Sequence, residues 1–311
     1  MFGVFCYYVM SVIKVQNISK HFGSLKAVDD LSFEVQAGQV FGFLGQNGSG
    51  KSTTIRMLLS LIHPTSGSIE LFGKRIEKNR EEILEQVGAI IERPDLYPYL
   101  SAKEHLQLFA KVRKQKIGEA DINATLEKVG LAHRAQDKVQ TFSLGMKQRL
   151  GIGIALVHNP SLIILDEPTN GLDPQGIADI RQLIQYLAKE EGKTVLVSSH
   201  LLSEIEQVAH QILIIHQGKK IALGPTATLL DPAKSLMKLN TTNDVLSKDK
   251  IAVSEFAAYQ LDREEGIYFS IPTEKIASLH QFIVNVGIPI VSLESKRSLE
   301  DYFLQITSQS N

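Results

Sequence analysis

Short apolar runs alternate with longer stretches of helical periodicity along most of the chain. The runs have the length and composition of buried β-strands, and they lie at 12–15, 40–44, 162–165, 194–198 and 212–215. Apolar residues recur at helical spacing over 53–61 and through most of 101–158, where Ser101 and Glu104 form a capping-box pattern that marks a helix start. Buried strands that alternate with helices predict an α/β fold with a mainly parallel sheet covered by helices.

The pattern changes near Pro232. Strand-like runs then follow at 235–240, 257–261, 266–271 and 288–293. Helical patterns separate them at 242–254 and 273–286, and a last helical pattern covers 298–307. The order β-α-β-β-α-β-α predicts a small α+β domain with a ferredoxin-like fold.

These changes of pattern divide the chain into an extra N-terminal segment at 1–10, a main domain at 11–232 with a helical subdomain at about 92–158, and a C-terminal accessory domain at 233–311. The first nine residues are apolar and aromatic, contain no Lys or Arg, and are too few to span a membrane. Because Met10 directly precedes the first patterned strand, we expect it to be the natural start. An interfacial membrane anchor is the alternative for this segment.

Composition excludes several classes of protein. The chain has 311 residues and a net charge of -1, so no strong attraction to nucleic acid is expected, and we predict no nucleic-acid partner. Cys6 is the only cysteine, which excludes an internal disulfide and a cysteine-rich metal site and fits a reducing compartment. No apolar run approaches the roughly 18–20 residues that span a bilayer, so work at a membrane would need another chain.

A glycine-rich loop joins the apolar run at 40–44 to the helical pattern at 53–61. It fits the phosphate-binding pattern G-x-x-x-x-G-K-[ST] and reads Gly45-Gln46-Asn47-Gly48-Ser49-Gly50-Lys51-Ser52, followed by Thr53. The glycines let backbone N–H groups converge on phosphate oxygens, and the helix N-terminus adds partial positive charge. We expect Lys51 to bind the β- and γ-phosphates of ATP and Ser52 to bind Mg²⁺. A turn that merely connects strand to helix is the alternative.

Two acids end the apolar run at 162–165. Ligands in open α/β sheets bind at the carboxyl ends of strands, so Asp166 is placed to hold Mg²⁺ and Glu167 to polarise the attacking water as a general base. A helix N-cap is the alternative, since acids are common just before helices. The phosphate loop upstream favours the catalytic interpretation.

The segment 142–149 reads Phe-Ser-Leu-Gly-Met-Lys-Gln-Arg and resembles the signature of ABC transporter ATPases. Ser143 and Gly145 match the signature serine and second glycine, whereas Leu144 and Met146 depart from the commoner glycine and glutamine. A plain helix N-cap is the alternative for Ser143. The resemblance implies that this helix N-terminus binds the γ-phosphate of ATP held by a second copy of the chain.

The resemblance covers about 11–225 and includes further motifs. Residues 170–173 resemble the family's D-loop, which communicates between two sites. His200 stands where the family has a switch histidine, which implies a hydrogen bond to the γ-phosphate that orients the water and Glu167. Phe22 matches the aromatic residue that stacks on adenine, although a core or turn aromatic is the alternative.

One position departs from the common pattern. The loop that joins the core to the helical subdomain usually carries a Gln that contacts Mg²⁺ and the water, and here that position holds Glu92. With the 142–149 segment and the ending at 298–303, this resembles the bacitracin- and lantibiotic-resistance branch of ABC exporters. A negative charge near the phosphates needs an offset from Mg²⁺ or from Arg93. We hypothesise that Glu92 couples nucleotide state to the permease; a solvated loop acid is the alternative.

The resemblance implies a P-loop NTPase core and the ATP-hydrolysing subunit of an ABC exporter. It would act at the cytoplasmic face of the cell membrane as a dimer with a second copy, bound to an integral-membrane permease, with ATP and Mg²⁺ as cofactors and an antimicrobial peptide as cargo. The alternatives are a soluble ABC ATPase without a permease, a phosphate-loop kinase, and a regulator that binds nucleotide but scarcely hydrolyses it. A kinase would not need the 142–149 segment, and Glu167 and His200 argue against a non-hydrolysing regulator.

Overall fold

The computed structural model describes residues 11–112, 116–229, 234–261 and 266–296. The chain forms two compact units, Met1–Gly224 and Pro225–Asn311. The prediction placed this boundary slightly later, near Pro232. The proposed extra segment at 1–10 and the expected helix at 298–307 lie outside the described residues.

The first unit contains an antiparallel sheet in the order β2-β1-β4-β5. Its strands are β1 (Ser11–Phe22), β2 (Leu25–Gln36), β4 (Ser66–Leu71) and β5 (Lys74–Arg75). Alternating positions of β1 and β2 are buried, including Ile13, Val15, Phe33 and Val35, because one face of this sheet covers the core.

The second sheet of this unit has six strands in the order β10-β9-β3-β8-β7-β6. Its strands are β3 (Val40–Leu44), β6 (Val87–Ile90), β7 (Leu162–Asp166), β8 (Thr194–Ser199), β9 (Gln211–His216) and β10 (Lys219–Pro225). The pairs β3–β8, β3–β9, β7–β8 and β6–β7 are parallel. Strands β3, β7 and β8 are buried throughout, which explains their continuous apolar sequences and confirms the predicted α/β fold.

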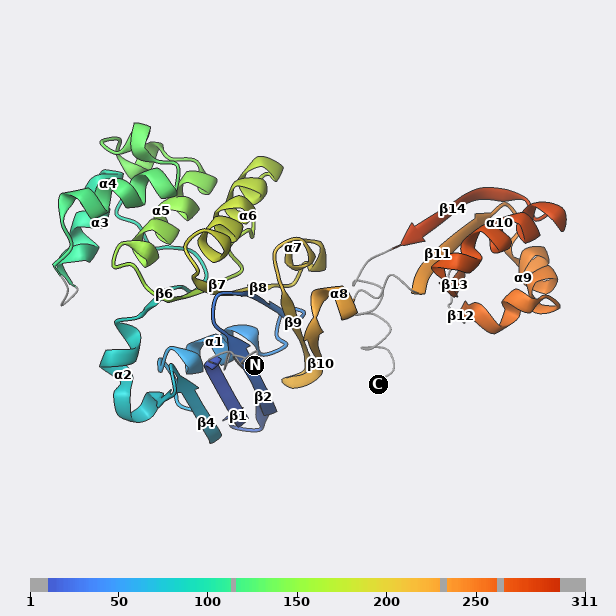
Figure 1. The fold of residues 1–311 in the computed structure, drawn as a ribbon, viewed down its shortest axis with the longest axis horizontal. Coiled ribbons are helices and arrows are strands. Elements are labelled where there is room, and N and C mark those ends of the chain that lie inside the picture. Colours follow the sequence, from blue (N-terminus) through green and yellow to red (C-terminus); the bar gives the residue numbers. More distant parts are fainter. Residues whose placement is uncertain (1–10, 113–115, 230–233, 262–265, 297–311) are drawn as a thin grey trace, which may run out of the picture. The chain divides into compact units, whose positions relative to one another are not determined.

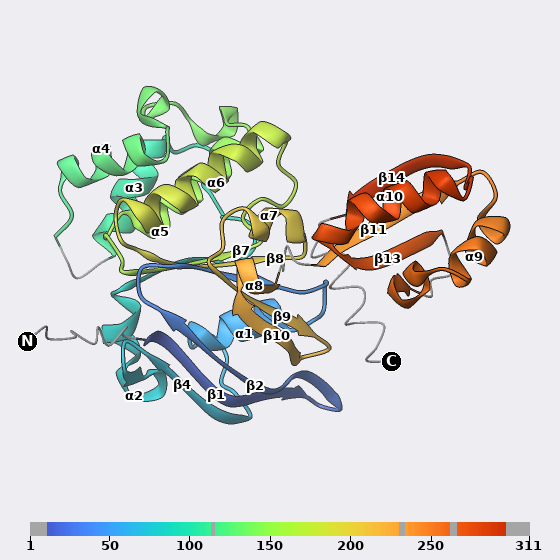
Figure 2. The same ribbon diagram turned by 45° about the vertical axis from the view of Figure 1, so that its right-hand side comes forward.

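Helices cover the parallel strands. They are α1 (Lys51–Leu58), α2 (Ile76–Leu84), α3 (Ala102–Lys111), α4 (Glu119–Lys128), α5 (Leu144–Leu156), α6 (Pro174–Lys189) and α7 (Leu202–Glu206), with 3-10 turns η1 (Ala132–Arg134) and η2 (Val139–Thr141). Helices α3, α4, α5 and α6 gather on one side of the parallel strands, and α1, α2 and the antiparallel sheet lie on the other (Figures 1 and 2). The predicted capping box is present, because Ser101 and Glu104 exchange hydrogen bonds at the start of α3.

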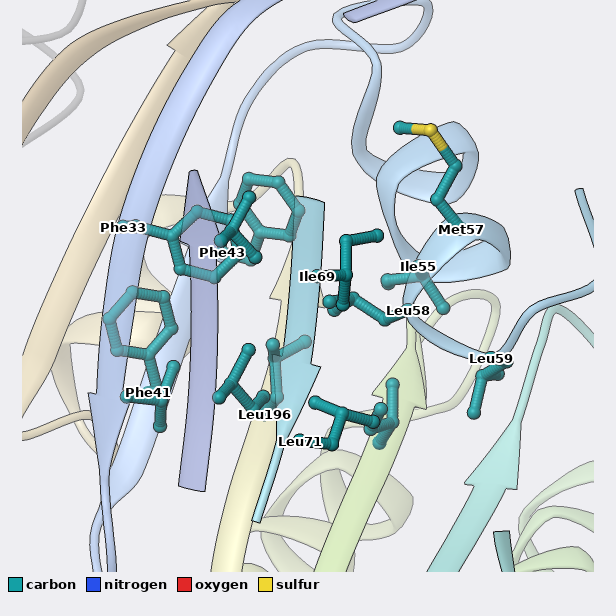
Figure 3. Close-up of a cluster of buried hydrophobic side chains, with 14 of the residues drawn as sticks. Phe33, Phe41, Phe43, Ile55, Met57, Leu58, Leu59, Ile69, Leu71 and Leu196 are labelled. Carbon is teal, nitrogen blue, oxygen red and sulfur yellow. The ribbon is translucent and has the colours of Figure 1, made fainter. Parts of the chain in front are cut away.

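The main core fills the space between the two sheets and α1. The rings of Phe33 and Phe41 stack with centroids 5.7 Å apart, and Phe43 lies against Phe33. Figure 3 shows Leu58 of α1 beside Ile69 of β4 in the same cluster. Burial of this helix face holds α1, and therefore the glycine-rich loop before it, against the end of β3.

The second unit has a four-stranded antiparallel sheet in the order β12-β13-β11-β14. Its elements are α8 (Thr226–Leu229), β11 (Lys234–Thr241), α9 (Asp244–Ala252), η3 (Glu255–Tyr259), β12 (Gln260–Leu261), β13 (Ile267–Pro272), η4 (Thr273–Lys275), α10 (Ile276–Asn285) and β14 (Ile290–Lys296). This is the predicted ferredoxin-like order of strands and helices. Its own core includes Leu239, Phe269 and Leu279.

The expected strand at 257–261 is wrong over most of its length. Residues Glu255–Tyr259 form the 3-10 helix η3, and only Gln260–Leu261 pair as a strand. The Ser254 hydroxyl accepts the Phe256 N–H and starts this turn, and the Phe256 ring packs 5.2 Å from that of Phe282. Packing of Phe256 therefore overrides the strand-like composition of the segment.

Candidate functional site

Four neighbouring parallel strands deliver the predicted site residues to one edge of the six-stranded sheet. The order β3, β8, β7, β6 places the glycine-rich loop, His200, the acids 166–167 and Glu92 next to one another. Parallel strands end at the same edge, so residues far apart in sequence meet there.

The glycine-rich loop has a backbone that other residues cannot adopt without strain. Gly48 and Gly50 have φ of 80° and 105°. A Cβ at Gly45 would lie 2.4 Å from the Ser49 hydroxyl oxygen and 2.7 Å from the carbonyl oxygen of Ile215. The loop therefore requires glycine at the positions where the sequence pattern has it.

Lys51 begins α1 and is buried beneath the loop. Its Nζ donates to the carbonyl oxygen of Gly45 at 2.6 Å and to that of Gln46 at 3.2 Å. The same ammonium lies 3.2 Å from Oε1 of Glu167. A buried cation held by two carbonyls and one carboxylate is suited to exchange these partners for phosphate oxygens.

Asp166 ends β7 and is 1% exposed. Its Oδ1 accepts a hydrogen bond of 2.5 Å from the Ser198 hydroxyl, which itself accepts the Glu167 N–H at 3.0 Å. Its buried Oδ2 accepts no hydrogen bond from any residue within the described ranges. A buried carboxylate oxygen without a protein donor fits a cation ligand, and the Ser52 side chain lines the same pocket.

Glu167 follows with a left-handed backbone, φ 49°. This conformation turns its carboxylate toward two cationic or polar partners. Oε1 faces Lys51, and Oε2 lies 2.8 Å from Nδ1 of His200, which donates when that nitrogen carries its proton. The side chain of Glu167 is 17% exposed, so the carboxylate is reachable from the pocket.

A pocket of about 670 Å³ lies over the loop. Its lining includes Phe22, Asp29, Lys51, Glu167 and Gln217. Phe22 is 50% exposed at the end of β1, and Nζ of Lys20 lies 5.2 Å from its ring centroid. The lining of the pocket therefore combines an exposed aromatic ring with the phosphate-binding loop, which suits a nucleotide. Gln46, Asn47 and Thr53 also line it.

Glu92 lies two residues beyond the end of β6 with φ 61°. Its carboxylate is 2.6 Å from the guanidinium of Arg56, which belongs to α1. A second pocket, of about 480 Å³, places Glu92 with Ser52, Asp166 and Glu167. The ion-pair partner of Glu92 in the structure is therefore Arg56, while Arg93 lines the same pocket and lies near Gly171.

Ser143 and Gly145 lie apart from these groups. Neither residue lines the two pockets around Lys51 and Asp166. Ser143 is the N-cap of α5, where its hydroxyl accepts the Met146 N–H at 3.2 Å, and its side chain is exposed. Because the start of this helix is free at the surface, it is available to a second molecule.

Other polar residues of the site were missed from sequence. Ser198 joins the two acids, and Arg56 pairs with Glu92. Thr169, Ser199 and Glu204 form a hydrogen-bonded group through the Glu204 carboxylate. Thr169 directly precedes the 170–173 segment and Ser199 directly precedes His200, and this adjacency is a sequence signal that could have found them.

Comparisons with known proteins agree with this geometry. The sequence model described as "ABC transporter" matches residues 28–170. The bacitracin transport ATP-binding protein BcrA of Bacillus licheniformis is 43% identical over 95% of this chain and 97% of its own length. The lantibiotic transport ATP-binding protein SrtF of Streptococcus pyogenes is 43% identical over 68% of this chain and 89% of its own length.

Solved structures with the same fold are ATP-binding cassettes. An ATP-binding subunit of an ABC transporter superimposes with a TM-score of 0.62 at 32% identity, covering 70% of this chain and 91% of that one. A dimeric cassette in a post-hydrolysis state, bound to ADP and Pi, has a TM-score of 0.62 at 25% identity, covering 69% and 98%. Within the described ranges, every helix is too short or too polar to cross a membrane.

Proposed function

Because the chain belongs to the family of ABC transporter ATP-binding proteins, we propose that it hydrolyses ATP to ADP and phosphate and thereby powers a separate membrane permease. The observation that carries the proposal is the Glu167 carboxylate, held between Lys51 and His200 at the edge of the nucleotide pocket. Both contacts involve groups that would also touch the γ-phosphate in the family's arrangement.

The glycine-rich loop and Lys51 would bind the phosphates, and Phe22 would stack on adenine. Phosphate oxygens compete with Glu167 for the Lys51 ammonium. When Lys51 turns to the phosphates, Oε1 of Glu167 becomes free to accept a proton from water, while His200 still holds Oε2. Binding of ATP would in this way release the base that hydrolyses it.

The residues present fit Mg²⁺. Asp166 Oδ2, the Ser52 hydroxyl and Glu92 would hold it, since carboxylate and hydroxyl oxygens are its preferred protein ligands. When bound, Mg²⁺ neutralises charge that develops on the phosphates. The Ser198 hydroxyl donates to Oδ1 of Asp166 and fixes the carboxylate, and Oδ2, which accepts from no described residue, is left for the cation.

A second copy of the chain would complete each site. Ser143 and Gly145 lie at an exposed helix start outside the pocket that holds Lys51, so one molecule alone does not bring both halves together. In a two-fold dimer each molecule gives its glycine-rich loop to one site and its 143–145 segment to the other. The dimeric relative bound to ADP and Pi supports this arrangement.

The relatives' names guide the choice of cargo. They describe transport of bacitracin and lantibiotics, so we propose an antimicrobial peptide as the transported molecule and the cytoplasmic face of the membrane as the place of action. Deleting the gene should raise sensitivity to such peptides. Unchanged sensitivity to bacitracin- and lantibiotic-like peptides would overturn the cargo while leaving the ATPase proposal intact.

The hydrolysis step is tested by Glu167→Gln. The amide keeps the shape of the side chain but accepts a proton poorly, so hydrolysis should stall while ATP still binds, and an ATP-stabilised dimer should appear in size-exclusion chromatography. Glu190→Gln, at an exposed acid at the end of α6, is the matched control and should hydrolyse ATP at the wild-type rate. A Glu167→Gln protein that turns over like wild type would remove Glu167 as the base.

A further inference from the structure

One carboxylate links the loop after Glu167 to the loop that carries His200. Glu204 lies on the short helix α7, and its Oε2 accepts hydrogen bonds from two hydroxyls. Thr169 donates one of them, and Ser199 donates the other at 3.0 Å. Thr169 follows β7, whereas Ser199 is the last residue of β8, so the two hydroxyls belong to two different strand ends of the parallel sheet.

Each hydroxyl leads directly to a part of the site. The carbonyl oxygen of Thr169 accepts the Leu172 N–H at 3.1 Å, so Thr169 anchors the turn at 170–173. Ser199 precedes His200, and its hydroxyl also accepts the Leu201 N–H at 2.9 Å. The carbonyl oxygen of Ser199 accepts the N–H of Gly45 at 3.3 Å. Through its hydrogen bonds to Thr169 and Ser199, Glu204 is therefore connected to the 170–173 turn, to His200 and to the glycine-rich loop.

The surroundings make these bonds strong and hard for water to replace. Ser199 is 1% exposed and Thr169 is 8% exposed. The small cavity beside them, about 20 Å³, is lined largely by apolar side chains, among them Ile177, Ile184 and Val197. Hydrogen bonds from hydroxyls to a carboxylate in such surroundings are stronger than those between neutral groups in water.

We propose that Glu204 is a positioning residue that couples the 170–173 turn to His200 and Glu167. This rests on the proposed function, in which a second copy approaches the surface that bears this turn. A shift of the turn on closure would move Thr169, and through Glu204 and Ser199 it would set the position of His200 against the Glu167 carboxylate. Phe22 and Lys51, which would contact the nucleotide, make their own contacts to Lys20, to the carbonyls of Gly45 and Gln46, and to Glu167, and not to Glu204.

If Glu204 had a structural role only, it would stabilise α7 without affecting the position of His200. Kinetic measurements separate this structural role from the positioning role. Glu204→Ala removes both acceptor bonds, whereas Glu204→Gln keeps a carbonyl oxygen that accepts them. A misplaced catalytic group costs rate without costing substrate affinity, so we expect Glu204→Ala to lower kcat roughly tenfold to a hundredfold with little change in the KM for ATP. We also expect the Hill coefficient for ATP to fall toward 1, and Glu204→Gln to restore much of both.

The experiment measures steady-state ATP hydrolysis by the full chain, together with binding of a fluorescent ATP analogue and the thermal unfolding midpoint. Glu206→Gln is the matched control, because Glu206 lies on the same helix and neither Thr169 nor Ser199 donates to it. The double variant Thr169→Val/Glu204→Ala should lose less kcat than the two single variants' losses combined, since both substitutions remove the same hydrogen bond.

The outcomes distinguish the two proposals. If wild type and Glu206→Gln are active and Glu204→Ala has an unchanged kcat and Hill coefficient, the positioning role alone is overturned. A Glu204→Ala protein that loses kcat only in proportion to its loss of folded molecules would overturn it too, and so would a Glu204→Gln protein no better than the alanine variant. A wild type without ATP hydrolysis would overturn the proposed function and the positioning role with it.

Discussion

The two units of this chain each contain a well-packed sheet, yet among the residues that the structure describes, reactive side chains gather at the edge of the six-stranded sheet of the first unit alone. In the six-stranded sheet, β3, β8, β7 and β6 run parallel, and their carboxyl ends carry Lys51, His200, the acids 166–167 and Glu92 at one edge. In the antiparallel sheet β12-β13-β11-β14, neighbouring strands end at opposite edges. Strand direction, and not apolar content, therefore decides where chemistry can assemble.

The polar residues of the second unit show the contrast. Asn240 of β11 donates to the Ser292 hydroxyl of β14 at 2.8 Å, and Nζ of Lys238 lies 5.6 Å from the ring centroid of Tyr268. Each of these contacts joins two side chains that face each other on paired neighbouring strands. They stabilise pairing, and over 234–261 and 266–296 this unit forms no shared edge comparable to the one around Glu167.

The largest expected effect is at the parallel edge. Lys51→Ala removes the buried ammonium that faces both the loop carbonyls and Glu167. Loss of one preorganised charge at a reacting phosphate costs roughly a hundredfold to a thousandfold in turnover, and steady-state ATP hydrolysis measures it. Lys189→Ala, on α6, is the control and should retain full activity. A Lys51→Ala protein with wild-type turnover would show that this edge is not the reactive one.

A matched pair of core changes asks whether the two sheets differ in function as well as in shape. Ile164 of β7 and Ile267 of β13 are both fully buried. Replacing either by Ala should cost about 2–5 kcal/mol of stability in its own unit, measured by chemical denaturation. Only Ile164→Ala should also lower ATP turnover per folded molecule, because β7 positions Asp166. Equal loss of turnover in both variants would contradict the comparison.

Glu92 offers a smaller effect at the same edge. Its carboxylate pairs with Arg56 of the helix that follows the glycine-rich loop, and Glu92 and Ser52 line one pocket. A substitution of Glu92 therefore changes the charge beside Ser52. Both groups are largely exposed, which limits the strength of the pair. We expect Glu92→Ala to lower ATP hydrolysis and transport by less than Lys51→Ala does, and Glu92→Gln to do so less than Glu92→Ala. If both variants hydrolyse and transport at wild-type rates, the coupling hypothesis is wrong.

The smallest effects concern helix starts, one in each unit. Ser101 caps α3 and Asn243 caps α9 through hydrogen bonds to backbone N–H groups. Ala at either position should cost about 1 kcal/mol of stability and leave turnover unchanged. Calorimetry of both variants checks this, and a loss of turnover in either would contradict it.

The Ser101 cap should also depend on pH. The hydrogen bond from the Ser101 backbone N–H lowers the pKa of the Glu104 carboxyl below its usual value. A lowered pKa in the folded state means that the contribution is fully present above the usual pKa of Glu and is lost as pH falls through the lowered value. The stabilities of Glu104→Gln and wild type should therefore converge as pH falls, because protonation removes the advantage of the Glu104 carboxylate, and a constant difference would contradict this.

Sequence predicted what depends on local pattern. The runs at 162–165 and 194–198 form buried β7 and β8, and the capping box starts α3 where Ser101 marks it. The glycine-rich loop joins β3 to α1, although α1 begins at Lys51, two residues before the expected helix. These features follow from apolar periodicity and from residue types that act on their own backbone.

What sequence missed depends on contacts between distant segments. Thr169 and Glu204 are 35 residues apart, and Arg56 and Glu92 are 36 apart, so no local spacing announces either pair. The strand expected at 257–261 is wrong because the packing of Phe256 against Phe282, from a later helix, favours the 3-10 helix Glu255–Tyr259. Neither kind of information is present in a single stretch of sequence.

The central claim is that each ATP site joins Lys51 of one molecule to Ser143 of another. The most direct measurement mixes two inactive variants, Lys51→Ala and Ser143→Arg, in equal amounts and follows ATP hydrolysis. In a mixed dimer one site carries both changes and the other carries neither, so activity should return, up to about one quarter of the wild-type value, since half of the dimers are mixed and each has one intact site. A mixture as inactive as its two components would contradict the shared site.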